Sequence, residues 1–218
     1  MNFLKTFKEL GAIWQHDRHP DRPYALLTSG KISDFFFNAS KVIEQPRVLG
    51  AVSDELVRLA KQEDPELSPD FVVGPAQGAI SLAHEVAGSL PPARSWFTEL
   101  PKNPEDGTDQ ELLRFEPGSE ALLGVRVEDV VTTGGSAMKT KDAVLRRNSA
   151  VKFAPFLLCI VNRSGSPTLS DGTKIISLIS VTPKTWDRGS NPFVPGRGEL
   201  VEPVRPKVNW DALTRAYD

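Results

Sequence analysis

The segment from Val125 to Ser136, VRVEDVVTTGGS, combines the groups that a phosphate ester needs. An apolar stretch runs into two carboxylates, Glu128 and Asp129, and ends in hydroxyls, two glycines and a serine that opens a predicted helix. Glycines let backbone N–H groups converge on an anion, and a helix start adds partial positive charge. The segment therefore predicts a phosphate cradle. The carboxylates before it could accept hydrogen bonds from vicinal hydroxyls of a ribose or help to place a magnesium ion.

Strand and helix patterns alternate on both sides of this segment. Short apolar runs predict buried strands, and apolar residues at helical spacing predict helices with one buried face. The predicted strands cover residues 70–76, 121–127, 151–161 and 173–181, and the predicted helices cover residues 48–60, 79–90 and 136–147. This alternation predicts an α/β fold with a mainly parallel sheet flanked by helices.

The remaining segments break that alternation. Residues 3 to about 14 have helical spacing, and residues 24–37 form two β-prone runs joined by the turn Thr28–Lys31. Residues 94–98 and 111–115 are β-like and flank a polar stretch with two prolines and a glycine, which predicts a surface loop. A proline-rich tail follows residue 182 and ends in a short predicted helix near Trp210.

Composition limits the classes of protein to consider. The chain has 218 residues, 39% of them hydrophobic, which suits one α/β domain with a sizeable core. The formal net charge of −2 provides no basic field for nucleic acid or an anionic membrane surface, so neither partner is expected. Cys159 is the only cysteine and lies in an apolar run, so we expect a buried core thiol. No stretch is long and apolar enough to span a bilayer, and we expect a cytoplasmic protein.

The segment 125–136 closely resembles the signature for 5-phosphoribosyl-1-diphosphate (PRPP) of the type I phosphoribosyltransferases. The resemblance implies that Glu128 and Asp129 face the ribose hydroxyls. It also implies that the 5-phosphate is held by Val131, Thr132, Thr133, Gly134, Gly135 and Ser136. The fold that it implies is one phosphoribosyltransferase domain over 1–218, with a mainly parallel twisted sheet flanked by helices. Its parts are a small N-terminal hood (1–45), an α/β core with a mobile loop (46–181) and a C-terminal tail (182–218).

Three more segments resemble the orotate-specific branch of that family. In Leu27–Asn38, Lys31 would approach the substrate while Phe35 and Phe36 stack on or enclose a pyrimidine. Val72–Ala79 resembles a diphosphate-binding loop, in which backbone amides come from Ala76, Gln77 and Gly78. Arg163 follows a predicted strand where an arginine would form a bidentate pair with the orotate carboxylate. Without the signature, the same residues predict only a hairpin with an aromatic stripe and a solvated arginine.

The implied reaction is attack of orotate on C1 of PRPP, with loss of diphosphate and formation of orotidine 5-phosphate. The resemblance further implies a Mg²⁺ cofactor carried by PRPP, with no metal held by protein side chains, and a homodimer whose loop closes over the site. In this chain the predicted loop is poor in cations, since Lys102 stands among Glu99, Glu105 and Asp106. Lys102 is therefore the one loop cation proposed for catalysis. Together with the two carboxylates of the signature, the candidate catalytic residues are Lys102, Asp129 and Glu128.

Three interpretations follow. The chain is an orotate phosphoribosyltransferase, a phosphoribosyltransferase for another base, or a non-catalytic PRPP or nucleotide sensor with a degenerate loop. The acidic loop favours the sensor, whereas Lys31, the paired phenylalanines and Arg163 favour the first interpretation, which we adopt. One residue fits none of them: Arg126 is a cation within a strand expected to be buried. It either pairs with a carboxylate or marks a strand near the sheet edge.

Overall fold

The computed structural model describes residues 1–101, 110–188 and 201–216. Its internal contacts divide the chain into two compact units. The first, here called the core unit, comprises residues 42–181 together with Met1. The second unit comprises residues 2–41 and 182–218, so it joins the start of the chain to its end.

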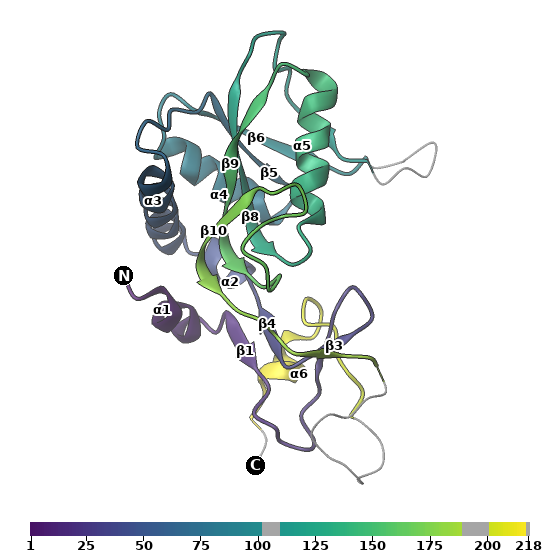
Figure 1. Cartoon of the computed structure of the whole chain (residues 1–218). Helices are drawn as coiled ribbons and strands as arrows, with labels where there is room; N and C mark the ends of the chain where they lie inside the picture. Colours follow the sequence, from purple (N-terminus) through teal and green to yellow (C-terminus); the bar gives the residue numbers. More distant parts are fainter. Residues whose placement is uncertain (102–109, 189–200, 217–218) are drawn as a thin grey trace. The chain divides into compact units, whose positions relative to one another are not determined.

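A six-stranded sheet organises the core unit (Figure 1). Its strand order is β10-β9-β8-β5-β6-β7, in which β7 alone is antiparallel to its neighbour. The strands are β5 (Phe71–Pro75), β6 (Arg94–Glu99), β7 (Leu112–Leu113), β8 (Leu123–Val131), β9 (Lys152–Asn162) and β10 (Lys174–Ser180). The mainly parallel sheet predicted from the alternating pattern is confirmed.

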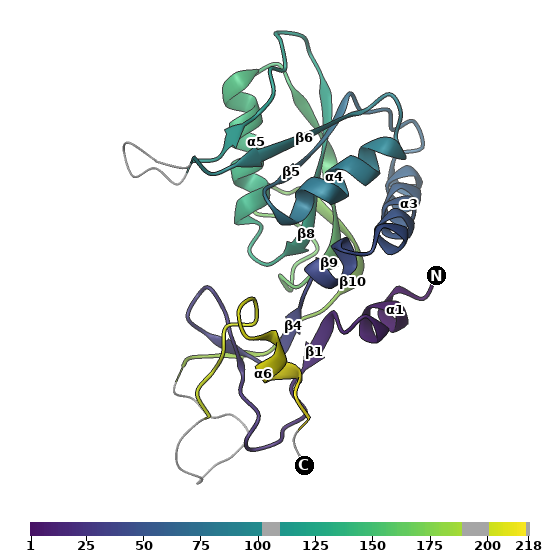
Figure 2. The ribbon, with the colours of Figure 1, turned by 180° about the vertical axis from the view of Figure 1, so that it is seen from behind.

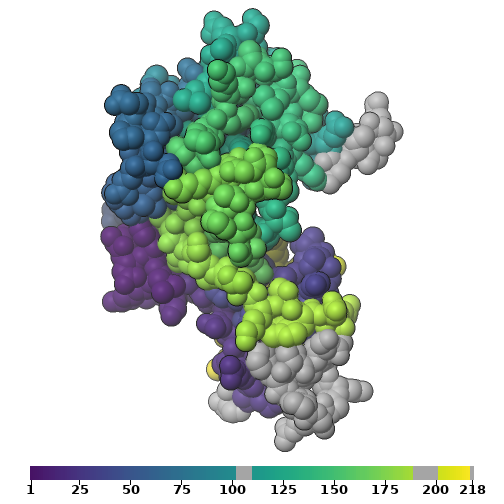
Figure 3. Space-filling view, in the orientation of Figure 1, coloured from purple at the N-terminus to yellow at the C-terminus, as the bar shows by residue number. Residues whose placement is uncertain are grey.

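Helices cover both faces of this sheet. α3 (Pro46–Glu63) and α4 (Gly78–Gly88) pack on one face and α5 (Gly135–Arg147) on the other, as Figures 1 and 2 show from opposite sides. α3 buries Leu49, Val52, Leu56 and Ala60, at the spacing that predicted it. Its other face is exposed and forms the blue surface in Figure 3.

Two details of the sheet differ from the predicted strands. β8 continues to Val131, four residues beyond the predicted end, because Val130 and Val131 still pair with Val161 and Asn162. The acidic pair therefore lies within the last part of the strand. The register between β8 and β9 also shifts between Gly124 and Arg126, beside Pro155, which has no N–H to donate to the sheet.

The second unit contains two small sheets and two short helices. Its elements are α1 (Phe3–Glu9), β1 (Ile13–Gln15), β2 (Ala25–Leu26), β3 (Ile32–Ser33), β4 (Phe35–Phe37), β11 (Thr185–Trp186) and α6 (Trp210–Thr214), and α2 (Ser40–Ile43) lies at its boundary. The predicted hairpin is confirmed, since β2 and β3 are antiparallel. The helix predicted to reach residue 14 ends at Glu9, because residues 13–15 pair with β4 instead. The tail joins this unit through Val204, whose N–H donates to the Tyr24 carbonyl at 3.0 Å.

Candidate active site

Asp129 lies against the start of α4. Glu128 and Asp129 are adjacent in β8, so their side chains point to opposite faces of the sheet. A Cβ atom placed on Gly78 would lie 2.2 Å from Asp129 Oδ2. The carboxylate can therefore approach residue 78 this closely only because that residue is glycine. Asp129 Oδ1 accepts a hydrogen bond from the Val130 N–H at 2.8 Å. The predicted ribose-binding carboxylate and the predicted diphosphate loop are thus brought together.

The loop itself is the short turn between β5 and α4. Ala76 and Gln77 are exposed, and Gly78 is half-buried as the first residue of the helix. The Ala76 N–H donates to the Thr98 carbonyl at 2.6 Å, which ties the turn to the end of β6. Gln77 and Gly78 therefore present backbone at the carboxyl end of a parallel sheet, where open α/β sheets bind ligands.

Glu128 lies in a different environment from Asp129. It is only 5% exposed, and burial, followed by the charges of Asp129 and Glu111, raises the pKa of its carboxyl well above the ordinary value. Glu111 is itself buried, and its carboxylate accepts hydrogen bonds from the hydroxyls of Thr98 and Thr140. Burial thus favours a protonated Glu128. Sequence reasoning missed Glu111 as a site residue, because it opens the β-like segment 111–115 and nothing in that segment marks its carboxylate as buried.

Cys159 is the β9 neighbour of Glu128 in the sheet register. It is fully buried, which confirms the predicted core thiol. Burial raises the pKa of the thiol well above its usual value. Cys159 is therefore a packing residue and not a nucleophile.

The cradle turns from the end of β8 into α5. Val131 is buried, whereas Thr132, Thr133, Gly135 and Ser136 are exposed. Gly134 has a φ of 78°, and a Cβ atom there would lie 2.4 Å from Leu169 Cδ2. Glycine is therefore required by both backbone conformation and packing. The hydroxyl residues Thr132, Thr133 and Ser136 are thus all exposed at the N-terminus of a 13-residue helix, as an anion site requires.

Arg163 begins the connection between β9 and β10. Its N–H donates to the Val131 carbonyl at 2.9 Å, so its backbone lies beside the first residue of the cradle. The side chain is half-buried, and burial lowers the pKa of the guanidinium. Within the residues that the structure describes, no acidic side chain pairs with Arg163. A guanidinium in this state can pair with the carboxylate of a ligand.

The predicted base-binding residues other than Arg163 lie in the second unit. Lys31 is 55% exposed in the β2–β3 turn, with its Nζ 3.9 Å from Asp187 Oδ1. Phe35 and Phe36 are half-buried in β4, and the ring of Phe36 lies 6.0 Å, centroid to centroid, from that of Trp210 in the C-terminal tail. Trp210 was not singled out as a site residue from the sequence. Lys102 lies outside the described residues.

Among the described residues, no group of three or more His, Cys, Asp or Glu side chains is arranged to hold a metal ion. In the same part of the chain, every helix is too short or too polar to cross a bilayer.

Comparison with known proteins defines the class and then the family. No protein-family model matches the chain. Among solved structures, the fold is similar to orotate phosphoribosyltransferase from Aeropyrum pernix, with a TM-score of 0.62 and 22% identity over 81% of this chain and 92% of that one. It is also similar to the Mycobacterium tuberculosis orotate phosphoribosyltransferase in complex with PRPP, with a TM-score of 0.50 and 19% identity over 75% and 90% of the two chains. The fold is that of a type I phosphoribosyltransferase.

Sequence identity to a relative identifies the family within this class. The orotate phosphoribosyltransferase of Deinococcus radiodurans is 33% identical over 187 residues, which are 80% of this chain and 84% of the relative. The chain belongs to the orotate phosphoribosyltransferase family.

Proposed function

We propose that the protein transfers the 5-phosphoribosyl group of PRPP to orotate, giving orotidine 5-phosphate and diphosphate. The proposal depends on one observation in the core unit. Asp129 lies against Gly78 of the Ala76–Gly78 turn, and the cradle follows Asp129 directly along the chain. These are the groups that a ribose, a diphosphate and a 5-phosphate require. Family membership supports orotate as the acceptor.

In this mechanism the chain acts by binding and charge placement. Thr132 to Ser136 hold the 5-phosphate, and Asp129 accepts hydrogen bonds from the ribose hydroxyls. The turn at Gln77 and Gly78 holds the diphosphate as the bond to C1 breaks. Positive charge then develops on the ribose ring, where the nearby Asp129 carboxylate stabilises it.

The orotate-binding roles are proposed residue by residue, from the resemblance to the orotate-specific branch. Arg163 would pair with its carboxylate, Lys31 would approach the substrate, and Phe35 and Phe36 would enclose the ring. Lys31 must then exchange its contact with Asp187 for the ligand. That contact is long and solvent-exposed, so the exchange costs little.

Mg²⁺ bound to PRPP would neutralise charge on the departing diphosphate. Lys102 would add a cation from the loop, and a homodimer in the cytoplasm is the expected form. These features rest on the resemblance and on the fold that the family shares.

One observation favours a non-catalytic PRPP sensor as the second candidate. Arg114, a basic residue close to the loop, is held by Glu99 with its Nε 2.7 Å from Glu99 Oε1. Lys102 is then the principal cation left for diphosphate in residues 99–109. A sensor would bind PRPP without releasing diphosphate.

A coupled assay separates these candidates. The purified protein is mixed with PRPP, Mg²⁺ and orotate, and loss of orotate absorbance is followed together with diphosphate release. Turnover that is lost in Asp129→Asn, and that requires more orotate in Lys31→Ala and Arg163→Ala, supports the proposal. Arg58→Ala, which removes an exposed arginine of α3 paired with Glu55, is the control and should retain wild-type turnover. PRPP binding without turnover would leave the sensor or another acceptor.

A further inference from the structure

Arg126 is a cation buried in the middle of the sheet. It is 1% exposed, and β8 lies between β5 and β9 in the strand order. Residues in the central strands of a parallel sheet are usually apolar, because helices cover both faces. The proximity of an edge therefore does not explain Arg126. Pairing with a carboxylate does, since its Nη2 lies 3.6 Å from Asp171 Oδ2.

The guanidinium joins two separate parts of the core unit. Arg126 Nη1 donates to the carbonyl of Ala137, in the first turn of α5, at 3.3 Å. Its Nη2 donates to the Thr173 hydroxyl at 2.6 Å, at the end of the β9–β10 connection. Asp171 also accepts from Lys141 of α5 at 2.7 Å. Arg126 thus links the helix that opens with the cradle to the connection 163–173.

That connection contacts the cradle at two points. Leu169 packs over Gly134, and the Arg163 N–H bonds the Val131 carbonyl at 2.9 Å. The Leu169 N–H donates to the Thr173 carbonyl at 2.8 Å, so the residue bonded by Arg126 also positions Leu169. A shift of Thr173 or Asp171 would therefore be transmitted to Gly134.

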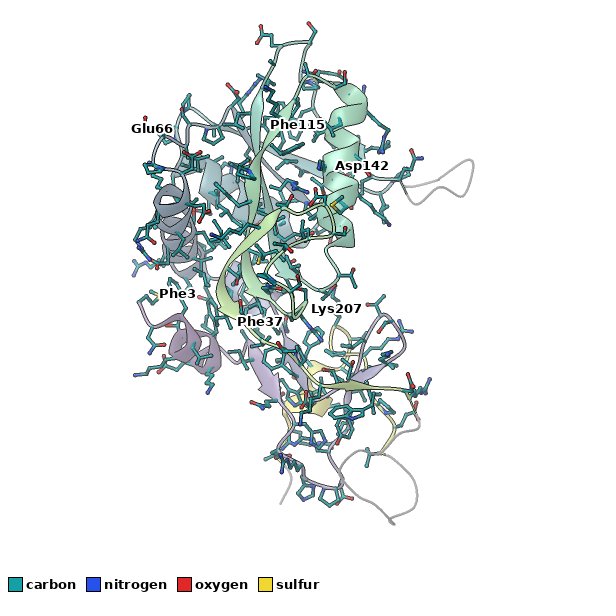
Figure 4. All side chains as sticks on the ribbon, in the orientation of Figure 1. Phe3, Phe37, Glu66, Phe115, Asp142 and Lys207 are labelled. Carbon is teal, nitrogen blue, oxygen red and sulfur yellow. The ribbon has the colours of Figure 1, made fainter. Side chains whose placement is uncertain are left out.

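Stability alone does not account for an arginine at this position. Burial lowers the pKa of the guanidinium, opposed by the charges of Asp171 and of Asp142, which lies on α5 (Figure 4). Among the described residues, Arg126 Nε has no hydrogen-bond partner. A well-packed apolar side chain is often as stable as a buried ion pair of this kind. An apolar residue could not make the hydrogen bonds by which Arg126 joins Ala137 to Thr173.

We propose that Arg126 is a positioning residue for the phosphate cradle: it holds the connection 163–173 against the first turn of α5 and so fixes Gly134 for the 5-phosphate. This inference rests on the proposed function, because it takes the cradle as the 5-phosphate site. It concerns one residue of this chain that contacts no substrate itself.

The test compares Arg126→Met and Arg126→Lys with the control Arg58→Met. Arg126→Met should fold, because Asp171 retains Lys141. Its affinity for inorganic phosphate, measured by calorimetry, should fall roughly tenfold (about 1.4 kcal/mol), the loss expected for one hydrogen bond to a charged group. The KM for PRPP should rise by a similar factor, while kcat stays near wild type. Arg126→Lys should recover part of the affinity, and Arg58→Met should change nothing.

Amide hydrogen exchange gives a second measurement that needs no ligand. Residues 132–138 and 164–173 should exchange faster in Arg126→Met, and α3 should be unaffected. Unchanged exchange, or wild-type phosphate affinity in folded Arg126→Met, overturns the inference. Should Arg126→Met not fold, Thr173→Val removes a single acceptor, and we expect roughly threefold weaker phosphate binding. Wild-type affinity in Thr173→Val would then overturn it.

These outcomes are separate from those of the proposed function. Wild-type protein that binds phosphate but neither binds PRPP nor consumes orotate contradicts the proposed function alone. The phosphate titration and the exchange experiment still decide the role of Arg126 in that case.

Discussion

Replacing Gly78 by alanine would test whether Asp129 works at the position in which the structure places it. The new Cβ would lie 2.2 Å from Asp129 Oδ2 and 2.6 Å from its Cγ. Non-bonded contacts to carbon are normally about 3.5 Å, so one partner must move by roughly 1 Å. α4 is packed on the sheet through Ala79, Leu82 and Val86, so the Asp129 side chain moves instead. The movement breaks its bond from the Val130 N–H.

The expected loss is in activity and not in stability. Misplacement of a reacting group by about 1 Å can reduce the rate by about 100-fold, or about 2.7 kcal/mol of transition-state stabilisation. The free energy of unfolding should change little, because an off-rotamer cost of roughly 0.5–1.5 kcal/mol is opposed by roughly 0.4–1 kcal/mol gained by removing a flexible glycine. Steady-state kcat/KM for PRPP and urea unfolding measure the two effects.

Gly88→Ala is the matched control, at the other end of the same helix. A Cβ there would meet nothing within 4 Å. Activity should remain within about twofold, while stability rises by about 0.5 kcal/mol. Wild-type kcat/KM in Gly78→Ala would refute the reasoning, because it would mean that activity does not depend on this position of the Asp129 carboxylate.

Two further predictions concern the cradle and the buried acid. Gly134→Ala should weaken phosphate binding by more than about tenfold and lower stability by about 1–3 kcal/mol, because φ is 78° and the new Cβ would overlap Leu169. Calorimetry measures the phosphate affinity, and thermal unfolding measures the stability. Unchanged phosphate affinity would argue against this cradle geometry. For Glu128, the folded-state pKa is raised, so the folded protein binds more protons than the unfolded chain as pH rises above the ordinary value of 4.5. Glu128→Gln should therefore gain stability relative to wild type as the pH rises above 4.5 in urea unfolding, and a difference that does not change with pH would contradict the assignment.

The parts of the fold that local spacing encodes could be predicted from the sequence. The β5–α4 and β8–α5 units follow from apolar runs and from glycines at the turns. The end of α1 could not be predicted, because residues 13–15 pair with Phe35–Phe37 rather than continuing the helix. That pairing joins residues 20 to 24 positions apart, and helical spacing contains no information about it.

The buried polar residues show the same limit at the site. In the sequence, Arg126 is an unexplained cation in a buried strand, and Glu111 is the first residue of a β-like segment. Their partners are Asp171 and Thr173 for the first, and Thr98 and Thr140 for the second. Asp171 and Thr173 lie on the β9–β10 connection, Thr98 on β6 and Thr140 on α5, so only the assembled core unit shows how the charges are satisfied.

The glycines of the two predicted phosphate-binding turns have a second function that the motif alone does not indicate. In the sequence they predict backbone N–H groups that approach an anion. In the structure, Gly78 also makes room for Asp129, and Gly134 makes room for Leu169. The diphosphate turn and the ribose carboxylate are therefore coupled by packing, as are the 5-phosphate cradle and the connection that begins with Arg163. A substitution at either glycine should disturb two binding groups together, so its effect on PRPP should exceed the loss of one backbone contact.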